Sequence, residues 1–93
     1  MAWRSTGGGS LEFRRWPEQW LVFHPLSGAT HLLSAFAGLL LETLDEQKQL
    51  LTRDALIELL AGDGEILSED ECLAVDASLH SFLQLGLAEE AWS

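Results

Sequence analysis

Cysteine and long apolar runs are both scarce in this sequence. A single thiol, Cys72, excludes an internal disulfide framework and fits a reducing compartment. The most apolar run, residues 32–44, is shorter than the roughly 20 residues that a helix needs to cross a bilayer. No basic segment followed by an apolar stretch opens the chain, so we expect no signal peptide. Together these absences predict a cytoplasmic protein that makes no membrane contact.

Positive charge is scarce too. Five Lys and Arg residues stand against 15 Asp and Glu residues, which gives a formal net charge of −10, and the acids are concentrated after residue 16. Such a chain repels phosphate backbones and anionic lipid, so nucleic acid and membranes are poor partners. A basic protein or peptide segment would be attracted instead. The alternative is that the acidity only keeps a small domain soluble.

The length and the apolar content predict one domain spanning residues 1–93. The chain has 93 residues, of which 47% are hydrophobic, enough for a single core. Residues 11–16 alternate in polarity, Pro17 and Glu18 favour a turn, and residues 19–24 form a second strand pattern. We therefore expect a hairpin over residues 11–24, and a first short strand over residues 2–5.

Residues 19–24 are apolar on both faces of the expected strand. Leu21 and Phe23 point one way, while Trp20 and Val22 point the other. A sheet in a domain of this size usually covers its core with one face only. The second face would then be covered by the N-terminal segment, by another subunit or by a ligand.

Three helices are expected after the hairpin. Apolar residues recur at steps of three and four near residues 29–46, 52–61 and 69–84, and Ser68 with Glu71 matches a capping box at the start of the third helix. Residues 87–92 form a short tail that can be extended. Strands followed by helices predict an α+β fold, with a small antiparallel sheet of two or three strands and the helices packed on one side.

Side chains that could carry chemistry are few. His24, His31 and His80 have no metal-ligand spacing, and the chain offers a single thiol, so we expect no metal site and no cofactor. Cys72 falls on the apolar stripe of its helix, where an inert thiol is common. No nucleophile stands near an identifiable base, and we therefore expect no enzymatic activity from the chain alone.

The segment Ser27-Gly28-Ala29-Thr30-His31 has two interpretations. Ser27 or Thr30 is predicted to cap the first helix, because each can accept a hydrogen bond from unpaired helix N–H groups. Alternatively, Ser27, Thr30 and His31 form a site for an anion or for phosphorylation, since negative charge is tolerated at a helix start.

The stretch WPEQWLVFHPLSGATHLL, residues 16–33, resembles the hairpin-to-helix joint of PqqD-type peptide chaperones. It is most similar to a PqqD-related subgroup associated with an HPr-kinase-like protein, the HPr-rel-A system. The similarity lies near Trp3, at residues 20–23 and at residues 27–33. Two positions depart from the pattern: Asp45-Glu46 replaces an Asp-Gly turn, and Ala29 stands where the subgroup often has Asp.

This resemblance implies a winged-helix-like fold of three strands and three helices that recognises peptides for a modifying enzyme. The peptide would add as a strand in a groove closed by the third helix. We carry this site onto the strand residues Gln19, Trp20, Leu21, Val22, Phe23 and His24, and onto the helix residues Leu73, Asp76, Ala77 and His80.

Three classes of function follow. The first is a non-catalytic adaptor for a peptide or protein segment, working with an HPr-kinase-like or other modifying enzyme. The second is a small carrier or substrate of that enzyme, modified at Ser27, Thr30 or His31. The third is a DNA-binding winged helix, which the acidity disfavours. Strand edges and four Trp residues also make a homodimer plausible.

Overall fold

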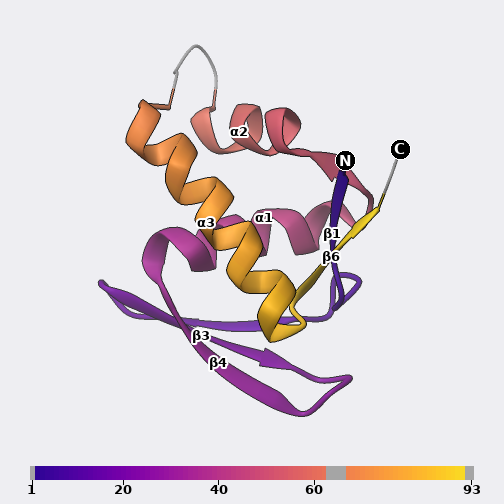
Figure 1. The fold of residues 1–93 in the computed structure, drawn as a ribbon. Coiled ribbons are helices and arrows are strands. Elements are labelled where there is room, and N and C mark those ends of the chain that lie inside the picture. The colour runs from indigo at the N-terminus through magenta and orange to yellow at the C-terminus, as the bar shows by residue number, and fades with distance from the viewer. Residues whose placement is uncertain (1, 63–66, 92–93) are drawn as a thin grey trace.

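The computed structural model describes residues 2–62 and 67–91, which form two small antiparallel sheets and three helices (Figure 1). The elements follow one another as β1 (Ala2–Ser5), β2 (Glu12–Arg15), β3 (Gln19–His24), β4 (Ala29–Ser34), α1 (Ala35–Gln47), β5 (Leu51–Thr52), α2 (Arg53–Ala61), α3 (Glu69–Leu85) and β6 (Ala88–Ala91). This is the expected α+β arrangement, in which an N-terminal antiparallel sheet precedes the helices.

The larger sheet has the strand order β2-β3-β4. The hairpin expected over residues 11–24 is confirmed, with Arg15 opposite Trp20 and Phe13 opposite Val22. On the other side of β3, Val22 lies opposite His31. The inner face of this sheet packs on α1 and includes Val22, which is fully buried. Its outer face carries the alternate side chains, Glu12, Arg14, Leu21, Phe23, Thr30 and Leu32.

The start of the first helix was predicted wrongly, because residues 29–34 form the strand β4. Burial alternates along this segment, with Leu33 inside and Leu32 outside. The helix α1 begins only at Ala35, and its N-cap is Ser34, whose Oγ accepts a hydrogen bond from the N–H of Ala37 at 3.1 Å. Pairing with β3 satisfies the backbone of residues 29–34, so helical hydrogen bonds are not needed there.

The second sheet joins both ends of the chain, with the order β5-β1-β6. The strand expected at residues 2–5 is confirmed, and the expected extended tail is the strand β6. Their pairing was not anticipated: Ala2 lies opposite Ala91 and Ser5 opposite Ala88. Figure 1 shows β1 and β6 side by side, next to the helices and apart from β3 and β4.

The two later helices begin where the sequence predicts. Thr52 caps α2 and accepts a hydrogen bond from the N–H of Ala55 at 3.2 Å. Ser68 and Glu71 form the predicted capping box of α3, with both reciprocal bonds at 3.2 Å. The core between the helices and the two sheets includes the fully buried residues Val22, Leu40, Leu41, Leu44, Leu56, Val75, Phe82 and Leu87.

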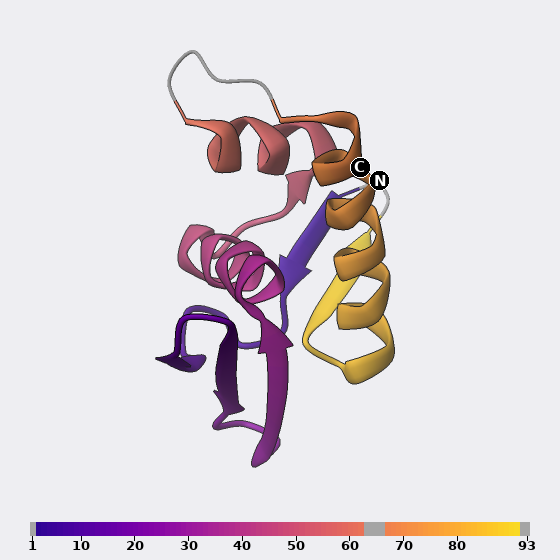
Figure 2. The ribbon, with the colours of Figure 1, turned by 90° about the vertical axis from the view of Figure 1, so that its left-hand side faces the viewer.

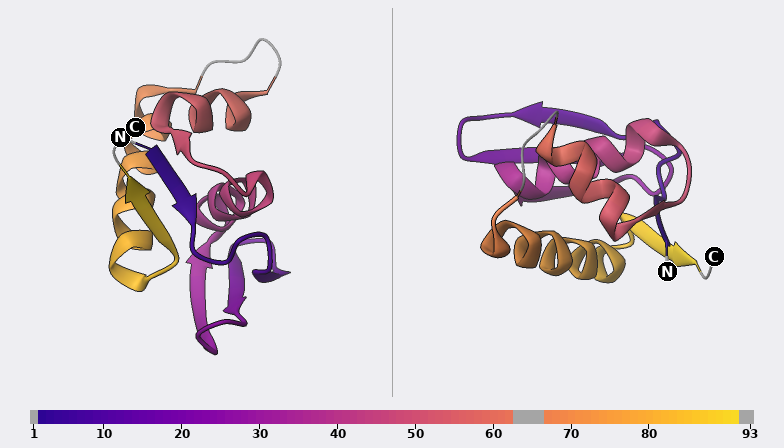
Figure 3. Two further views of the ribbon diagram at one scale, coloured as in Figure 1. Left: turned by 90° about the vertical axis from the view of Figure 1, so that its right-hand side faces the viewer. Right: turned by 90° about the horizontal axis from the view of Figure 1, so that it is seen from above.

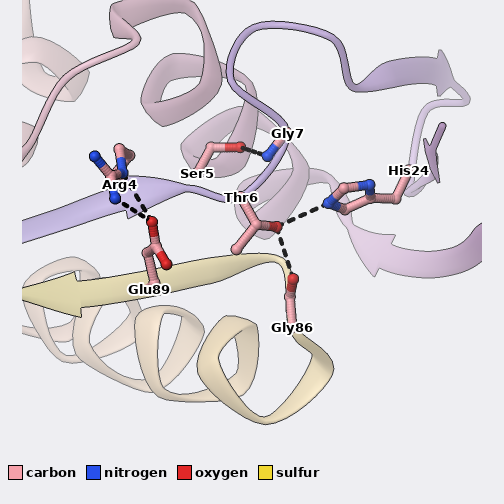
Figure 4. Close-up of polar contacts among 7 residues, drawn as sticks. All are labelled: Arg4, Ser5, Thr6, Gly7, His24, Gly86 and Glu89. Carbon is pink, nitrogen blue, oxygen red and sulfur yellow. Dashed lines mark hydrogen bonds and ion pairs between the residues drawn. The ribbon is translucent and has the colours of Figure 1, made fainter. Parts of the chain in front are cut away.

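A polar junction holds the end of β1 against β3 and the end of α3 (Figure 4). The hydroxyl of Thr6 donates to the carbonyl of Gly86 at 2.7 Å, and Nε2 of His24 lies 2.8 Å from the same oxygen of Thr6. Because a hydroxyl has one proton to donate, the His24 ring must carry its proton on Nε2 and donate it to Thr6. The junction therefore fixes the tautomer of a side chain that is only 5% exposed.

Candidate functional site

The strand over residues 19–24 was predicted to receive the peptide as an added strand, which requires a free edge, and that prediction is wrong. β3 lies between β2 and β4, so its backbone hydrogen bonds are made on both sides. Val22 is fully buried and His24 is nearly so. No extended peptide can therefore add beside β3. The outer strands of this sheet are β2 and β4.

A groove of about 340 Å³ runs between β4 and α3, which we call the β4–α3 groove. Figure 2 shows β4 as the strand of its sheet that faces α3, with β2 on the far side. The groove is lined by Leu32, Leu33, Ser34, Ala37, Ala77, Ser78, Ser81, Phe82 and Leu85. Nothing in this lining carries a charge. The groove thus places an outer strand next to an uncharged, largely apolar wall.

The side of this groove formed by α3 consists mainly of small side chains, which leave space above the helix surface. Ala77 and Ser81 lie one helical turn apart and are both exposed, and Ser78 is half-buried. Larger apolar side chains, Leu33 and the fully buried Phe82, form its deeper part. A bulky apolar side chain from a ligand would therefore find room between α3 and the sheet, and would exchange water for apolar contacts.

The pattern of hydrogen bonds between β2, β3 and β4 shows which backbone groups of β4 have no partner in the sheet. The N–H of Trp16 donates to the carbonyl of Gln19 at 2.9 Å, next to the pair Arg15–Trp20. Hydrogen-bonded pairs alternate with non-hydrogen-bonded pairs in an antiparallel sheet, so Trp20 and Val22 make no backbone bonds to β2. Their N–H and C=O groups point toward β4 instead. Trp20 and Val22 therefore bond to Leu33 and His31, and the N–H and C=O groups of Thr30 and Leu32 point to the free edge.

Only one of the four predicted helix residues, Ala77, lines this groove. Asp76 and His80 line a different cleft of about 430 Å³, together with Trp3, Arg53, Leu79, Leu83 and Glu90. There Nε of Arg53 donates a hydrogen bond to the carboxylate of Asp76. This bond, and then the negative charge of Asp76, raise the pKa of Arg53 above its already high usual value. Leu73 lines neither cleft and is 60% exposed.

The three residues of the predicted modification site do not gather at a helix start. Ser27 lies exposed in the turn between β3 and β4, where its Oγ accepts from the N–H of Ala29 at 3.3 Å. Thr30 and His31 are neighbours in β4 and so point to opposite faces of the sheet. The predicted helix-capping roles of Ser27 and Thr30 are therefore wrong, and no helix N-terminus is available there for an anion.

The second apolar face that the sequence predicts for residues 19–24 is the outer face of the larger sheet, which carries Leu21 and Phe23. A depression of about 630 Å³ is lined by Trp16, Pro17, Glu18, Gln19, Leu21 and Leu32. Trp16 is 52% and Leu32 is 57% exposed. The second apolar face of β3 is thus left partly open by the described chain, since Phe23 is also 36% exposed.

Residues 2–62 and 67–91 contain neither a metal-binding cluster nor a membrane-spanning helix. No group of three or more His, Cys, Asp or Glu side chains is arranged to hold a metal ion in this part of the chain. None of the helices described has both the length and the apolar character needed to cross a membrane. Cys72 is half-buried and unbonded to another cysteine.

Comparison with known proteins gives no relative by which to assign the site. The chain matches no protein-family model, no curated protein and no solved structure. The candidate site therefore consists of the β4–α3 groove and the two outer strands of the larger sheet.

Proposed function

We propose that this chain is a non-catalytic peptide-binding adaptor. An extended segment of a peptide or protein adds as a strand beside β4, with α3 as the second wall, and is presented to a partner modifying enzyme. The observation that carries this proposal is the outer strand β4 bordering an uncharged groove of about 340 Å³. Main-chain hydrogen bonds give affinity in such a mode, and pockets for alternate side chains give selectivity.

The geometry of β4 supports a definite register for the ligand. The outward N–H and C=O groups of Thr30 and Leu32 would bond to the peptide backbone. A ligand residue opposite Leu33 would direct its side chain to the inner face, as Leu33 does. There it would meet the small residues Ala77 and Ser81. We therefore expect a bulky apolar residue at this ligand position.

The resemblance to PqqD-type chaperones supports peptide binding between the same strand and the same helix. In that family a peptide binds beside the third strand, in a groove closed by the third helix. Within the sheet β2-β3-β4 the third strand is β4, and the third helix is α3. The proposed strand is therefore residues 29–34 and not residues 19–24. Of the helix residues predicted from the sequence, the proposed peptide contacts keep Ala77 and no longer include Leu73, Asp76 and His80.

The charge of the chain favours a ligand with basic flanking residues. The formal net charge is −10, and Glu69, Asp70 and Glu71 begin the helix that forms one wall. The groove lining itself is uncharged, so charge would act on the approach of the ligand more than on its final contacts. Association should then slow as salt rises, because the Debye length is about 8 Å at physiological ionic strength.

The exposed hydroxyl of Ser27 keeps the carrier alternative open. Ser27 lies at a turn and Thr30 on the outer face, so both are accessible to a kinase. Incubation with an HPr-kinase-like enzyme and ATP, followed by mass spectrometry, distinguishes the two functions. A stoichiometric phosphate on Ser27, Thr30 or His31 without peptide binding would support the carrier function and contradict the adaptor.

The adaptor function is tested by selecting linear peptides from a phage-displayed library and titrating a synthetic hit into isotope-labelled protein. Amide shifts should cluster in residues 29–34 and 77–85. Shifts confined to β6, or a library that yields no binder, would contradict the proposal. NOEs between the ligand backbone and Leu32 would identify strand addition directly.

Two variants sharpen this test. Ser81→Leu fills the groove and should weaken the selected peptide about tenfold or more, since it removes the space for one apolar side chain. Gln84→Leu is its matched control, because Gln84 is exposed on the same helix and lines neither cleft. Equal loss of binding in both variants would show that the groove is not the site.

A further inference from the structure

The strand β2 is the other outer strand of the larger sheet, and it is built differently from β4. Its outer-face side chains, Glu12 and Arg14, are both exposed and opposite in charge. Its inner-face side chains are engaged within the chain. Phe13 packs edge-to-face on Trp20 with ring centroids 6.1 Å apart, and Arg15 pairs with Glu42 of α1.

Arg14 differs from the other arginines in having no ion-pair partner among residues 2–62 and 67–91. Arg4 pairs with Glu89, Arg15 with Glu42, and Arg53 with Asp76. The unpaired cation of Arg14 and the exposed carboxylate of Glu12 lie on the same outer strand, and a second strand with opposite charges could pair with both. The chain therefore presents one positive and one negative group, two residues apart, on the same face of a strand with a free side.

The backbone of β2 is available at the position between these charges. Trp16 bonds to Gln19 across the turn, so the even-numbered residues of β2 make the hydrogen-bonded pairs with β3. The N–H and C=O groups of Phe13 consequently point away from β3, toward the free side of the strand. A second strand could bond to both.

We propose that β2 is the interface for a second copy of this chain, paired antiparallel about a two-fold axis at Phe13. The N–H and C=O groups of Phe13 then bond to those of Phe13 in the second copy. Glu12 lies opposite Arg14 of the second copy, and symmetry repeats this pair. The charged pairs fall at non-hydrogen-bonded positions, where side chains approach most closely. The two sheets become one continuous sheet of six strands.

Charge selects this register over its neighbours. In an antiparallel pair the residue numbers of opposite residues add up to a constant, which is 26 for the register centred on Phe13. If both inner faces are to lie on the same side of a continuous sheet, this sum can change only in steps of two. One neighbouring register places Glu12 opposite Glu12, and the other places Arg14 opposite Arg14. Like charges directly opposite each other destabilise a strand pair, so only the register centred on Phe13 makes attractive pairs.

The interface leaves the β4–α3 groove open. β2 and β4 are on opposite sides of β3, as Figure 2 shows, so the dimer would carry two grooves at the far ends of its sheet. With four-residue strands the contact is small, and we expect a dimer that dissociates in the micromolar range or above, on the order of 10⁻⁶–10⁻⁴ M. Its existence does not depend on the proposed peptide binding.

Charge-reversal variants test the interface by sedimentation equilibrium of the full chain. Glu12→Arg and Arg14→Glu should each weaken the dimer about tenfold or more, because each creates two repulsive pairs. The double variant Glu12→Arg/Arg14→Glu should restore the wild-type dimer, since both pairs are reversed together and the net charge stays at −10. An equimolar mixture of the two single variants should form a heterodimer, because each repulsive pair then becomes attractive.

Glu58→Arg is the matched control, as it reverses an exposed charge on α2 away from β2 and should leave the dimer unchanged. Far-UV circular dichroism checks that each variant is folded. The proposal is overturned if the wild-type chain sediments as a monomer up to millimolar concentration. It is also overturned if the double variant and the mixture fail to recover the dimer.

Discussion

The indole ring of Trp20 packs directly against the backbone of α1 at Gly38. A Cβ atom placed on Gly38 would lie 2.6 Å from two ring carbons of Trp20, a distance at which something must shift. The guanidinium of Arg15 lies over the same Trp20 ring, 4.7 Å from its centroid. The hairpin β2-β3 is therefore held on α1 by close approach at a residue without a side chain.

Gly38→Ala should destabilise the protein by about 1–3 kcal/mol, as overpacking commonly does. The sign is informative, because alanine in place of a helical glycine otherwise stabilises by about 1 kcal/mol. Urea unfolding followed by circular dichroism measures the effect. In a Trp20→Leu background the loss should shrink or change sign, since the clash is with the indole ring. A stabilised single variant would contradict the packing.

Ser34→Ala should cost about 1 kcal/mol, because Ser34 is the N-cap of α1. Ser27→Ala is the matched comparison and should cost less than about 0.5 kcal/mol, since Ser27 makes only one exposed bond in a turn. The two free energies of unfolding, measured side by side, distinguish the observed helix start from the one that the sequence predicts. The reverse order of losses would place the cap at Ser27.

Asp45→Ala should cost about 3 kcal/mol or more, because the buried donors of Ser5 and Leu11 and the part-buried N–H of Gly9 would lose their acceptor. The carboxylate of Asp45 accepts from the hydroxyl of Ser5 at 2.7 Å and from the N–H groups of Gly9 at 2.9 Å and Leu11 at 3.2 Å. Asp45→Asn should cost less, as the amide oxygen keeps part of this set. Hydrogen exchange should show protection lost first in residues 6–11. Equal stability of the alanine variant would contradict this role.

Thr6→Val should cost about 1–3 kcal/mol, because Nε2 of His24 would be left as a buried donor without an acceptor. Thr6→Ser keeps the hydroxyl and should cost clearly less. The proton-bearing nitrogen of His24 is accessible to ¹⁵N NMR, and the wild-type ring should show the Nε2–H form. A ring that carries its proton on Nδ1 would contradict the assignment of Thr6 as donor to Gly86 and of His24 as donor to Thr6.

The features that the sequence predicts correctly depend on residues close to one another along the chain. The hairpin over residues 11–24 follows from alternation around a Pro-Glu turn, and the caps Thr52 and Ser68 bond within their own first turns. The buried stripe of α1 follows from leucines at helical spacing, of which Leu40 and Leu44 are fully buried. Phe36 belongs to the same stripe but is only half-buried.

The strand β4 shows why local pattern misleads at the candidate site. Residues 29–34 combine a capping residue with leucines that continue into α1, so their pattern suits a helix start. The Figure 3 views show this segment as a strand running into α1. Its backbone bonds to β3, and that pairing makes β3 the central strand and β4 the outer one. The strand proposed to pair with a peptide is therefore β4 and not β3.

Composition and short-range spacing are enough to predict the α+β class, the order of hairpin and helices, and the acidity. Contacts in the folded chain are needed to know which strands are outermost, which helix residues face a strand, and that β1 pairs with β6 at the other end of the chain. Strand partners and buried acceptors such as Asp45 are distant in sequence, so no local pattern encodes them. Chain folding brings them together because buried backbone and polar groups must find hydrogen-bond partners.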